Sequence, residues 1–524
     1  MTILAALKRM KRGKKDGTCD ISSDYLLNAS NILLVHMSML FQAIFRHGKC
    51  PSAFGSSTVI PLPKNKRKSL ADSDNYRSIA IGSIISKLFD LVIMKASECI
   101  LCCSDYQYGF RSEHSTIQCT FVLKETVQYY KNGGSNVHAM FLDASKAFDK
   151  VQHIRLFRVL KAKGICPMTL RVLIILYADQ RLRIRWGTAH SRDVPVSNGV
   201  KQGGVISPVL FTNYIDELLK RLRASGLVWY IGHTFCGSFG YADDVALLAP
   251  TRSCLRSMLS ICDSFAEEFL LTFNPIKSKY LVFRDSTNVH QALSFRWRDL
   301  ILKESPNEVH LGTSVETGTG DARAMVHQAV CQFYARFNVV ISNFSFCSNS
   351  VKYFLFKSLC MSVYTSQLWD FESRSVEQFF VAWRKAIRRL LRLPSRTHNC
   401  LLHLIVNDMP VECQLHRRFV KFFFKCTYSS NACTRVCTHL ATLNSNSNVS
   451  NSLNHISSLY RFHYSDFQLC SLSNILPLIH RTSDVHEIQR ASAIIDFLNF
   501  QNSSIDHNNI NFILNFLCTD EISH

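Results

Sequence analysis

Apolar and polar positions alternate in short runs through the middle of the chain. The segment FGYADDVALLA contains two β-prone apolar stretches, residues 239–243 and 245–249. A tight turn falls between them, so the pattern predicts a β-hairpin with the carboxylates of Asp243 and Asp244 at its tip.

An earlier apolar run, residues 137–142, predicts a strand that ends at Asp143. We expect Ser145 to cap the helix that follows, and we expect that helix to end near Gly164. Its apolar positions recur at helical spacing: Phe148, Val151, Ile154, Phe157 and Leu160. Asp143 therefore stands at the carboxyl end of a strand, where functional carboxylates of α/β sheets are common.

Residues 197–223 combine a glycine pair with a helix start. Gly203 and Gly204 let the backbone approach a ligand closely, and Ser207 followed by Pro208 predicts a helix N-cap and first turn. Gln202 stands beside this opening and is able to hydrogen-bond a nucleotide or a template sugar. An ordinary glycine turn before a helix is the alternative interpretation.

Arginines alternate with apolar residues in RLRIRW, residues 181–186. As a strand, this segment places Arg181, Arg183 and Arg185 on one face. Two interpretations remain open for that face, contact with solvent or contact with phosphate groups.

The C-terminal half is patterned for helices. Residues 333–344, 351–364 and 382–393 carry apolar residues at helical spacing. The last of these segments has a basic face, which suits contact with the phosphates of a nucleic-acid duplex, and which consists of Arg384, Lys385, Arg388, Arg389 and Arg392. The Asn- and Ser-rich stretch at 443–455 predicts a linker.

Composition narrows the class of protein. The chain has 524 residues, 47% of them hydrophobic, and a net charge of +21, which predicts a globular protein that attracts polyanions. We find no uninterrupted run of about 18 apolar residues and expect no membrane segment. The 20 cysteines follow no regular framework, which favours a reducing, intracellular location, in the nucleus, the cytoplasm or both. The basic run at residues 8–15 is a weak candidate for phosphate binding or nuclear import.

Adjacent carboxylates repel each other, so the pair at 243–244 is stable mainly when a cation neutralises it or when it is a solvated turn. Mg²⁺ prefers oxygen ligands of this kind, and Mn²⁺ is a substitute. If the strand that ends at Asp143 lies beside the hairpin, three carboxylates meet, enough to hold two ions roughly 4 Å apart for phosphoryl transfer.

The order of these segments resembles that of the reverse transcriptases of non-LTR retrotransposons (long interspersed elements). The resemblance covers roughly residues 50–430 and rests on IPLPKNKRKSLADSDNYRSIAIGSIISKLFDLVI, QYGFRSEHST, FLDASKAFD, GVKQGGVISPVLF, YADD, FNPIKSKYLVF and HLG. A further stretch, WRKAIRRLLRLPSRTHN, is similar to a region beyond the palm in some branches. Ser78 stands where the family usually has a proline.

The resemblance implies an α+β fold of the right-hand polymerase type, with fingers, a palm whose antiparallel sheet is backed by helices, and a helical thumb. The implied organisation is a basic N-terminal extension at 1–50, fingers at 51–135, palm at 136–315, a thumb-like region at 316–427 and a C-terminal region at 428–524. The implied activity is RNA-directed DNA synthesis from dNTPs on an RNA template and a DNA primer, with two Mg²⁺ ions.

The same resemblance implies roles for individual residues. Asp143, Asp243 and, less directly, Asp244 match the metal-binding carboxylates. Phe148 matches the aromatic residue that excludes a ribose 2′-hydroxyl, although core packing is an equally good role for it. Gln202 and Gly203 match residues near the incoming nucleotide, Arg77 and Lys64 match basic residues that grip the triphosphate, and Lys277, in competition with Lys279, matches a general acid.

Alternative functions remain open at this point. The chain is also compatible with a degenerate RNA-binding remnant that no longer polymerises, with an enzyme like a group II intron maturase, or with an RNA-directed RNA polymerase. At most 50 residues precede the fingers, so we expect no upstream endonuclease in this sequence. Cys426, Cys433, Cys437 and His439 lack the spacing of a standard zinc knuckle, and unrelated reduced thiols are the favoured interpretation.

Overall fold

The computed structural model describes residues 2–17, 21–227, 229–284, 294–317, 321–445 and 447–460. The chain divides into two compact units. The first unit comprises residues 1–119, 136–282 and 290–305, and the second comprises 120–135, 283–289 and 306–524. Among the described residues, no helix has both the length and the apolar character needed to cross a membrane.

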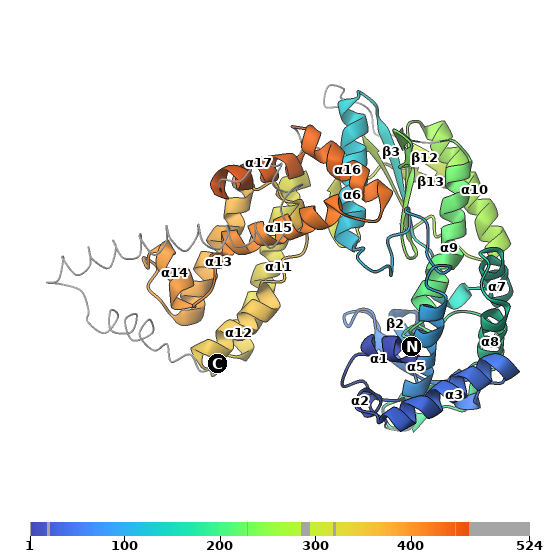
Figure 1. The fold of residues 1–524 in the computed structure, drawn as a ribbon. Helices are drawn as coiled ribbons and strands as arrows, with labels where there is room; N and C mark the ends of the chain where they lie inside the picture. Colours follow the sequence, from blue (N-terminus) through green and yellow to red (C-terminus); the bar gives the residue numbers. More distant parts are fainter. Residues whose placement is uncertain are drawn as a thin grey trace. The chain divides into compact units, whose positions relative to one another are not determined.

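A four-stranded sheet forms the centre of the first unit. Its order is β11 (Lys279–Phe283), β3 (Val137–Leu142), β10 (Asp244–Ala249) and β9 (Ser238–Tyr241). Strand β10 runs antiparallel to both β3 and β9. Helices α9 (Ser207–Ala224) and α10 (Arg252–Phe269) pack against this sheet (Figure 1). Every residue of β3 is buried, which explains why its sequence is apolar except for His138, whose Nδ1 lies 2.8 Å from the hydroxyl of Tyr280.

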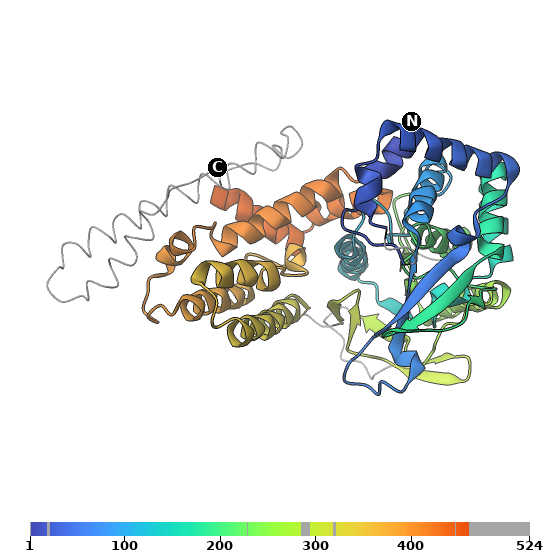
Figure 2. The ribbon, with the colours of Figure 1, turned by 90° about the horizontal axis from the view of Figure 1, so that it is seen from below.

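A second sheet of the first unit is built from β2 (Tyr76–Gly82), β1 (Ser56–Pro63), β4 (Arg181–Trp186) and β5 (Ala189–His190), with β6 (Val194–Pro195) beside β4. Strand β1 is antiparallel to β2 and parallel to β4, and the two long strands β1 and β4 lie side by side in Figure 2. This sheet joins the region expected to form fingers with a segment about 120 residues further along the chain.

Helices surround both sheets. The other helices and short strands assigned to the first unit are α1 (Thr2–Lys8), α2 (Ser23–Leu27), α3 (Asn31–His47), α4 (Ser52–Gly55), η1 (Ser73–Asn75), α5 (Ile84–Ala96), η2 (Ala147–Lys150), α7 (His153–Ala162), α8 (Pro167–Ala178), β7 (Tyr230–Ile231), β8 (Thr234–Phe235), β12 (Ser294–Trp297) and β13 (Leu300–Lys303). The described part of residues 1–50, expected as an extension, thus contains helices α1, α2 and α3 of the first unit, and α1 packs on α5.

The second unit is helical apart from one hairpin, among its described residues. The hairpin is formed by β14 (Asn307–His310) and β15 (Thr313–Glu316), and helix α6 (Thr116–Asn132) lies mostly in this unit. The other helices are α11 (Asp321–Asn343), α12 (Asn349–Cys360), η3 (Ser366–Leu368), α13 (Arg374–Leu391), α14 (Asn399–Ile405), α15 (Val411–Thr427), α16 (Ala432–Leu443) and α17 (Asn448–Tyr460). The expected α+β class is confirmed, and the expected domain boundaries stay predictions.

Aromatic side chains form much of the core of the second unit. Phe333 of α11 contacts Phe337 of the same helix, Phe356 of α12 and Phe379 of α13. The apolar spacing in three separate segments therefore reflects one shared core, which holds these helices together.

Two local predictions in the first unit were wrong. The helix after Asp143 is not capped by Ser145: Lys146 takes a left-handed conformation with φ 50°, a short 3₁₀ turn follows, and the α-helix begins only at His153. Ile154 is accordingly exposed. Ser207 is not the N-cap of α9, because Ile206 holds that position, although Pro208 lies in the first turn as expected.

The Asn- and Ser-rich stretch at 443–455 was predicted to be a linker, which was also wrong. Helix α16 ends at Leu443, and α17 begins at Asn448. The buried residues of α17 recur at helical spacing and include Val449, Leu453, Ile456 and Tyr460. The many Asn and Ser residues between these apolar positions led to the prediction of a linker. The rest of the predicted C-terminal region, residues 461–524, lies outside the described residues.

Candidate active site

The tip of the β9–β10 hairpin is held in place by a distant segment. Asp244 pairs with Tyr241, so the two turn residues are Ala242 and Asp243, and the turn lies one residue earlier than the sequence predicted. Ala242 has φ 58°, and its N–H donates to Oε1 of Gln107 at 2.9 Å. A Cβ on Gly109 would lie 2.3 Å from the Ala242 nitrogen. The QYG segment therefore fixes the conformation of the acidic turn.

Asp143 follows the last residue of β3 and is anchored through its backbone. Its N–H donates to Oγ of Ser278 at 3.2 Å, and its carbonyl oxygen accepts from the N–H of Asn274 at 2.8 Å. The Nζ atom of Lys277 lies 3.9 Å from Oδ2 of Asp143. The segment predicted to supply a general acid thus positions both Asp143 and Lys277, while Lys279 is the first residue of β11.

The three carboxylates act on one another electrostatically. Strand register places Val245 opposite Leu142, so Asp244 and Asp143 follow at the same edge of the sheet. Burial, together with the charge of Asp143, raises the pKa of Asp243. Desolvation and the charges of Asp243 and Asp143 raise the pKa of Asp244 to about 6, although its side chain still reaches solvent at the sheet edge. The site therefore gathers negative charge that Lys277, 3.9 Å from Asp143, offsets only in part.

A divalent cation is the group that such a site would accept. Among the described residues, no three His, Cys, Asp or Glu side chains lie close enough together to hold one ion, so a complete three-carboxylate ligand set is not formed. Asp143 and Asp243 nevertheless supply hard oxygen donors from two segments at one edge, and their mutual repulsion favours a cation between them. In donor chemistry the residues fit a divalent metal.

The glycine loop before α9 is packed against the backbone of the other sheet. The N–H of Ala80 donates to the carbonyl of Gln202 at 2.7 Å, and a Cβ on Gly203, which has φ 105°, would lie 2.7 Å from the Ala80 oxygen. Gly203 is therefore required for this contact between protein segments. Its proposed approach to a ligand remains a prediction. Nε2 of Gln202 donates to Oδ1 of Asp149 at 3.1 Å.

Two half-buried charged residues also hold this loop. Asp90 of α5 accepts hydrogen bonds from the backbone of Ile206 and Val205, and burial raises its pKa to about 6. It caps α9 from another helix, which explains how that helix starts without a capping side chain of its own. Lys201 donates to the carbonyl of Gly55 at 3.0 Å.

Phe148 lies between two other aromatic rings. It stacks on Phe211 of α9 with centroids 4.3 Å apart, and its centroid is 6.2 Å from that of Phe110 in an edge-on arrangement. Its side chain is half-buried, so one part packs in the core while another reaches the surface. Both roles expected for Phe148 are thus compatible with its surroundings.

The arginines of β4 share a face with Arg77. Strand β1 pairs Ser56 with Arg181 and Thr58 with Arg183, and it pairs Leu62 with Arg77 on its other side. Because alternate residues of β1 point to one face, Arg77 lies on the same face as Arg181, Arg183 and Arg185. Arg183 pairs with Asp193 at 2.8 Å and Arg181 with Asp179 at 3.8 Å, both at exposed positions. We call these four arginines the arginine face.

Lys64 and Lys146 contact the same residue, Asp74. Its Nζ donates to the backbone oxygen of Asp74 at 2.9 Å, and Lys146 pairs with the Asp74 carboxylate at 2.7 Å. Neither Lys146 nor Asp74 was given a role from the sequence. The structural feature that singles out Lys146 as a candidate functional residue is its left-handed backbone conformation, two residues before Phe148.

The predicted basic face of α13 is largely engaged within the second unit. Arg384 pairs with Glu377, and the guanidinium of Arg388 donates to the carbonyl of Thr397 and to Oδ1 of Asn399, each at 2.6 Å. Arg389 lies over the ring of Phe337, with Cζ 5.8 Å from the centroid. Arg392 ends the helix in a left-handed conformation and is exposed. Nucleic-acid binding by these residues stays a prediction.

The cysteines considered for zinc are packed as core residues. Cys426, Cys433 and Cys437 are buried, whereas His439 is exposed. Sγ of Cys437 lies 3.7 Å from Oγ1 of Thr126 in α6. Within the described ranges, no group of three metal-binding side chains includes them.

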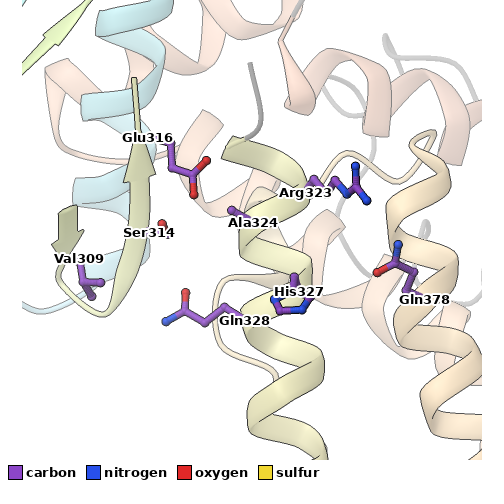
Figure 3. A pocket seen from close by; sticks show the side chains of 8 residues that line it. All are labelled: Val309, Ser314, Glu316, Arg323, Ala324, His327, Gln328 and Gln378. Carbon is purple, nitrogen blue, oxygen red and sulfur yellow. The ribbon is translucent and has the colours of Figure 1, made fainter. Parts of the chain in front are cut away.

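A cavity of about 540 Å³ lies within the second unit, between the β14–β15 hairpin, α11 and α13 (Figure 3). It is lined by Val309, Ser314, Glu316, Arg323, Ala324, His327, Gln328 and Gln378. It contains none of the residues predicted from the sequence to bind or react.

Comparison with known proteins identifies a similar family and similar relatives. Residues 62–310 match the family described as "Reverse transcriptase (RNA-dependent DNA polymerase)". The chain is 27% identical over 239 residues to a Pol polyprotein from the type-1 retrotransposable element R2 of Nasonia vitripennis, which covers 45% of this chain and 23% of that protein. It is 24% identical over 382 residues to the RNA-directed DNA polymerase from mobile element jockey of Drosophila melanogaster, with coverage of 69% and 40%.

Among solved structures, apo telomerase from Candida tropicalis shares 11% identity with this chain at a TM-score of 0.40, covering 86% of this chain and 74% of that one. The chain spans between 23% and 40% of the length of the two curated relatives named above.

Proposed function

Because residues 62–310 match the reverse transcriptase family, we propose that this protein is an RNA-directed DNA polymerase of a non-LTR retrotransposon. The observation that supports this most directly is the edge of the central sheet. Strand pairing brings Asp143 and the turn that carries Asp243 to this edge, and burial, with the charge of Asp143, raises the pKa of Asp243. An acidic, incompletely neutralised edge is what a nucleotidyl transfer site requires.

The proposed reaction is the transfer of a nucleotide from a dNTP to a primer 3′-hydroxyl on an RNA template. The 3′-hydroxyl releases its proton to solvent as its oxygen forms a bond to the α-phosphorus, the bond from that phosphorus to the bridging oxygen breaks, and pyrophosphate leaves. Two Mg²⁺ ions, when bound, supply positive charge at the attacking and leaving oxygens. Asp143 and Asp243 would hold these ions, with Asp244 beside them. Reverse transcriptases as a family use divalent metals.

Lys277 is the proposed proton donor to the leaving pyrophosphate. Its Nζ lies 3.9 Å from Asp143, so its side chain already extends toward the reacting centre. Phe148 is proposed to select dNTPs over rNTPs, because its half-buried ring is held by Phe211 and cannot move aside easily. Gln202, Gly203, Arg77 and Lys64 are proposed to contact the nucleotide.

Primer extension on poly(rA)/oligo(dT) tests the proposal. The wild-type chain should extend the primer with Mg²⁺ or Mn²⁺, and Asp243→Asn should reduce the rate by about 10³-fold or more because a metal-binding carboxylate is lost. RNA binding, measured by filter retention, should be unchanged. Asp193→Asn, which removes the exposed carboxylate paired with Arg183, is the matched control.

Two results would contradict the assignment. Extension that survives Asp243→Asn would remove this carboxylate from its role. RNA binding by a wild-type chain that extends no primer would favour the alternative of a non-catalytic RNA-binding remnant.

Nucleotide selection gives a separate test. Phe148→Ala should raise rNTP incorporation relative to dNTP by about 10- to 200-fold, the range expected when a pocket no longer rejects a small added group. The measurement is the ratio of kcat/KM values for the two nucleotides. Phe110→Ala removes the other neighbouring ring and should change this ratio much less. An unchanged ratio in Phe148→Ala would leave core packing as the sole role of this ring.

A further inference from the structure

Lysines from three segments gather around Asp74, at the turn between β1 and β2. Nζ of Lys146 lies 2.7 Å from Oδ1 of Asp74, and Nζ of Lys64 donates to the backbone oxygen of Asp74. The contact with Lys146, and then the charges of Lys64 and Lys277, hold the pKa of Asp74 below its usual range. Lys277 also lies 3.9 Å from Asp143. The carboxylate of Asp74 thus lies among three lysines, one of which, Lys277, also lies close to Asp143 of the proposed active site.

The backbone of Lys146 is fixed, so only its side chain is able to change partner. Ala144 pairs with Phe273, and the N–H of Ser145 donates to the carbonyl of Thr272 at 2.9 Å. On the other side, the N–H of Asp149 donates to the carbonyl of Lys146 at 3.0 Å. Lys146 itself has φ 50°, a conformation that is uncommon for lysine and that persists only where neighbouring contacts impose it.

The ion pair between Lys146 and Asp74 is easily exchanged. The two side chains are 55% and 67% exposed, and surface pairs of this kind contribute little to stability. Two other carboxylates act on Lys146, those of Asp149 and Asp72, but both have partners: Asp149 accepts from Gln202, and Asp72 accepts from the N–H of Asp74. Asp74 is therefore the acid that a stronger anion would displace.

We propose that Lys146 binds the triphosphate of the incoming nucleotide. In the free protein Asp74 forms an ion pair with the ammonium group of Lys146, and the nucleotide displaces Asp74 when it binds. A triphosphate carries several negative charges, so it competes effectively with one carboxylate for the position beside Lys64, Lys146 and Lys277. This inference rests on the proposed polymerase function, to which it adds one binding residue and one competing residue.

Steady-state primer extension with the full chain tests both parts. Asp74→Asn removes the competing charge and should lower KM for dNTP about threefold. Lys146→Ala should raise KM about tenfold with a smaller effect on kcat, the size expected for one charge-assisted hydrogen bond. In the Lys146→Ala background, Asp74→Asn should change KM little, because the ammonium group for which they compete is gone. Lys66→Ala, at an exposed position of the same loop, is the control.

The opposite result for Asp74 is equally informative. If Asp74→Asn leaves KM unchanged or raises it, Asp74 supports nucleotide binding or plays no part in it, and the proposal is wrong. Thermal melts of each variant exclude loss of folding as the cause.

A binding measurement separates this inference from the proposed function. Calorimetric titration of the full chain with tripolyphosphate in EDTA requires no polymerase activity. Binding should be tighter in Asp74→Asn and weaker in Lys146→Ala than in wild type, and equal affinities in all three would overturn the inference. Wild type that binds tripolyphosphate in this pattern but extends no primer would contradict the polymerase function alone.

Discussion

Two clusters of like charge in this protein have opposite surroundings. At the edge of the central sheet, Asp143, Asp243 and Asp244 repel one another and have raised pKa values at the last two positions. On α13 of the second unit, Arg384 and Arg388 are similarly close in sequence, but Glu377, Thr397 and Asn399 bind them. Charge that the fold leaves unsatisfied indicates a ligand site, whereas satisfied charge indicates a structural role.

Replacing Arg388 gives the largest expected effect on stability. Arg388→Met removes the hydrogen bonds from a half-buried guanidinium to Thr397 and Asn399, and should lower the free energy of unfolding by about 2 kcal/mol. Lys385→Met, on the exposed side of the same helix, should change it by less than about 0.5 kcal/mol. Chemical denaturation measures both. Equal small effects would mean that the arginines of α13 are not structural and would weaken the comparison.

The acidic edge should make the stability of the folded protein fall as the pH rises. Because the folded-state pKa of Asp244 is raised to about 6, its contribution to stability is present below about pH 4 and is lost as the pH rises through 6. In the metal-free protein, Asp244→Asn should therefore reduce the fall in melting temperature between pH 4 and pH 7. A fall of equal size in wild type and variant would contradict the raised pKa. Asp193→Asn serves again as the control.

The same protonation should weaken metal binding at low pH. One carboxyl with a pKa near 6 is about 97% ionised at pH 7.5 and about 24% at pH 5.5, so affinity for Mn²⁺ should fall about fourfold. Titration followed by paramagnetic relaxation of water measures this. In Asp244→Asn the fall should be smaller, and an identical pH dependence would exclude Asp244 as the titrating group.

The smallest expected effect is on RNA binding, and it compares the arginine face with the arginines of α13. Arg185→Ala, on the arginine face, should weaken RNA binding about threefold and reduce the slope of log affinity against log salt by about one. Arg384→Ala should change that slope less, because Glu377 already engages its guanidinium. Equal slopes for the two variants would indicate that the internal pairing on α13 does not limit phosphate contact.

The sequence by itself determined which strands carry the carboxylates, because an apolar run that ends at Asp143 and another that begins after Asp244 are local patterns of buried strands. It also determined the helical character of the second unit. It misplaced the hairpin turn by one residue and assigned a linker where α17 forms, since neither turn register nor the burial of Val449 and Leu453 is a property of the local sequence.

Only the tertiary structure decided which charges meet. Asp74 and Lys146 are 72 residues apart, and Gln107 reaches the Ala242 turn across 135 residues. The arginines of α13 are alike in sequence, yet Arg384 pairs with Glu377 of the same helix, whereas Arg388 and Arg389 contact Thr397 and Phe337 outside it. Pairing across such separations depends on how strands and helices pack, and the chemistry of each charged group follows from that packing.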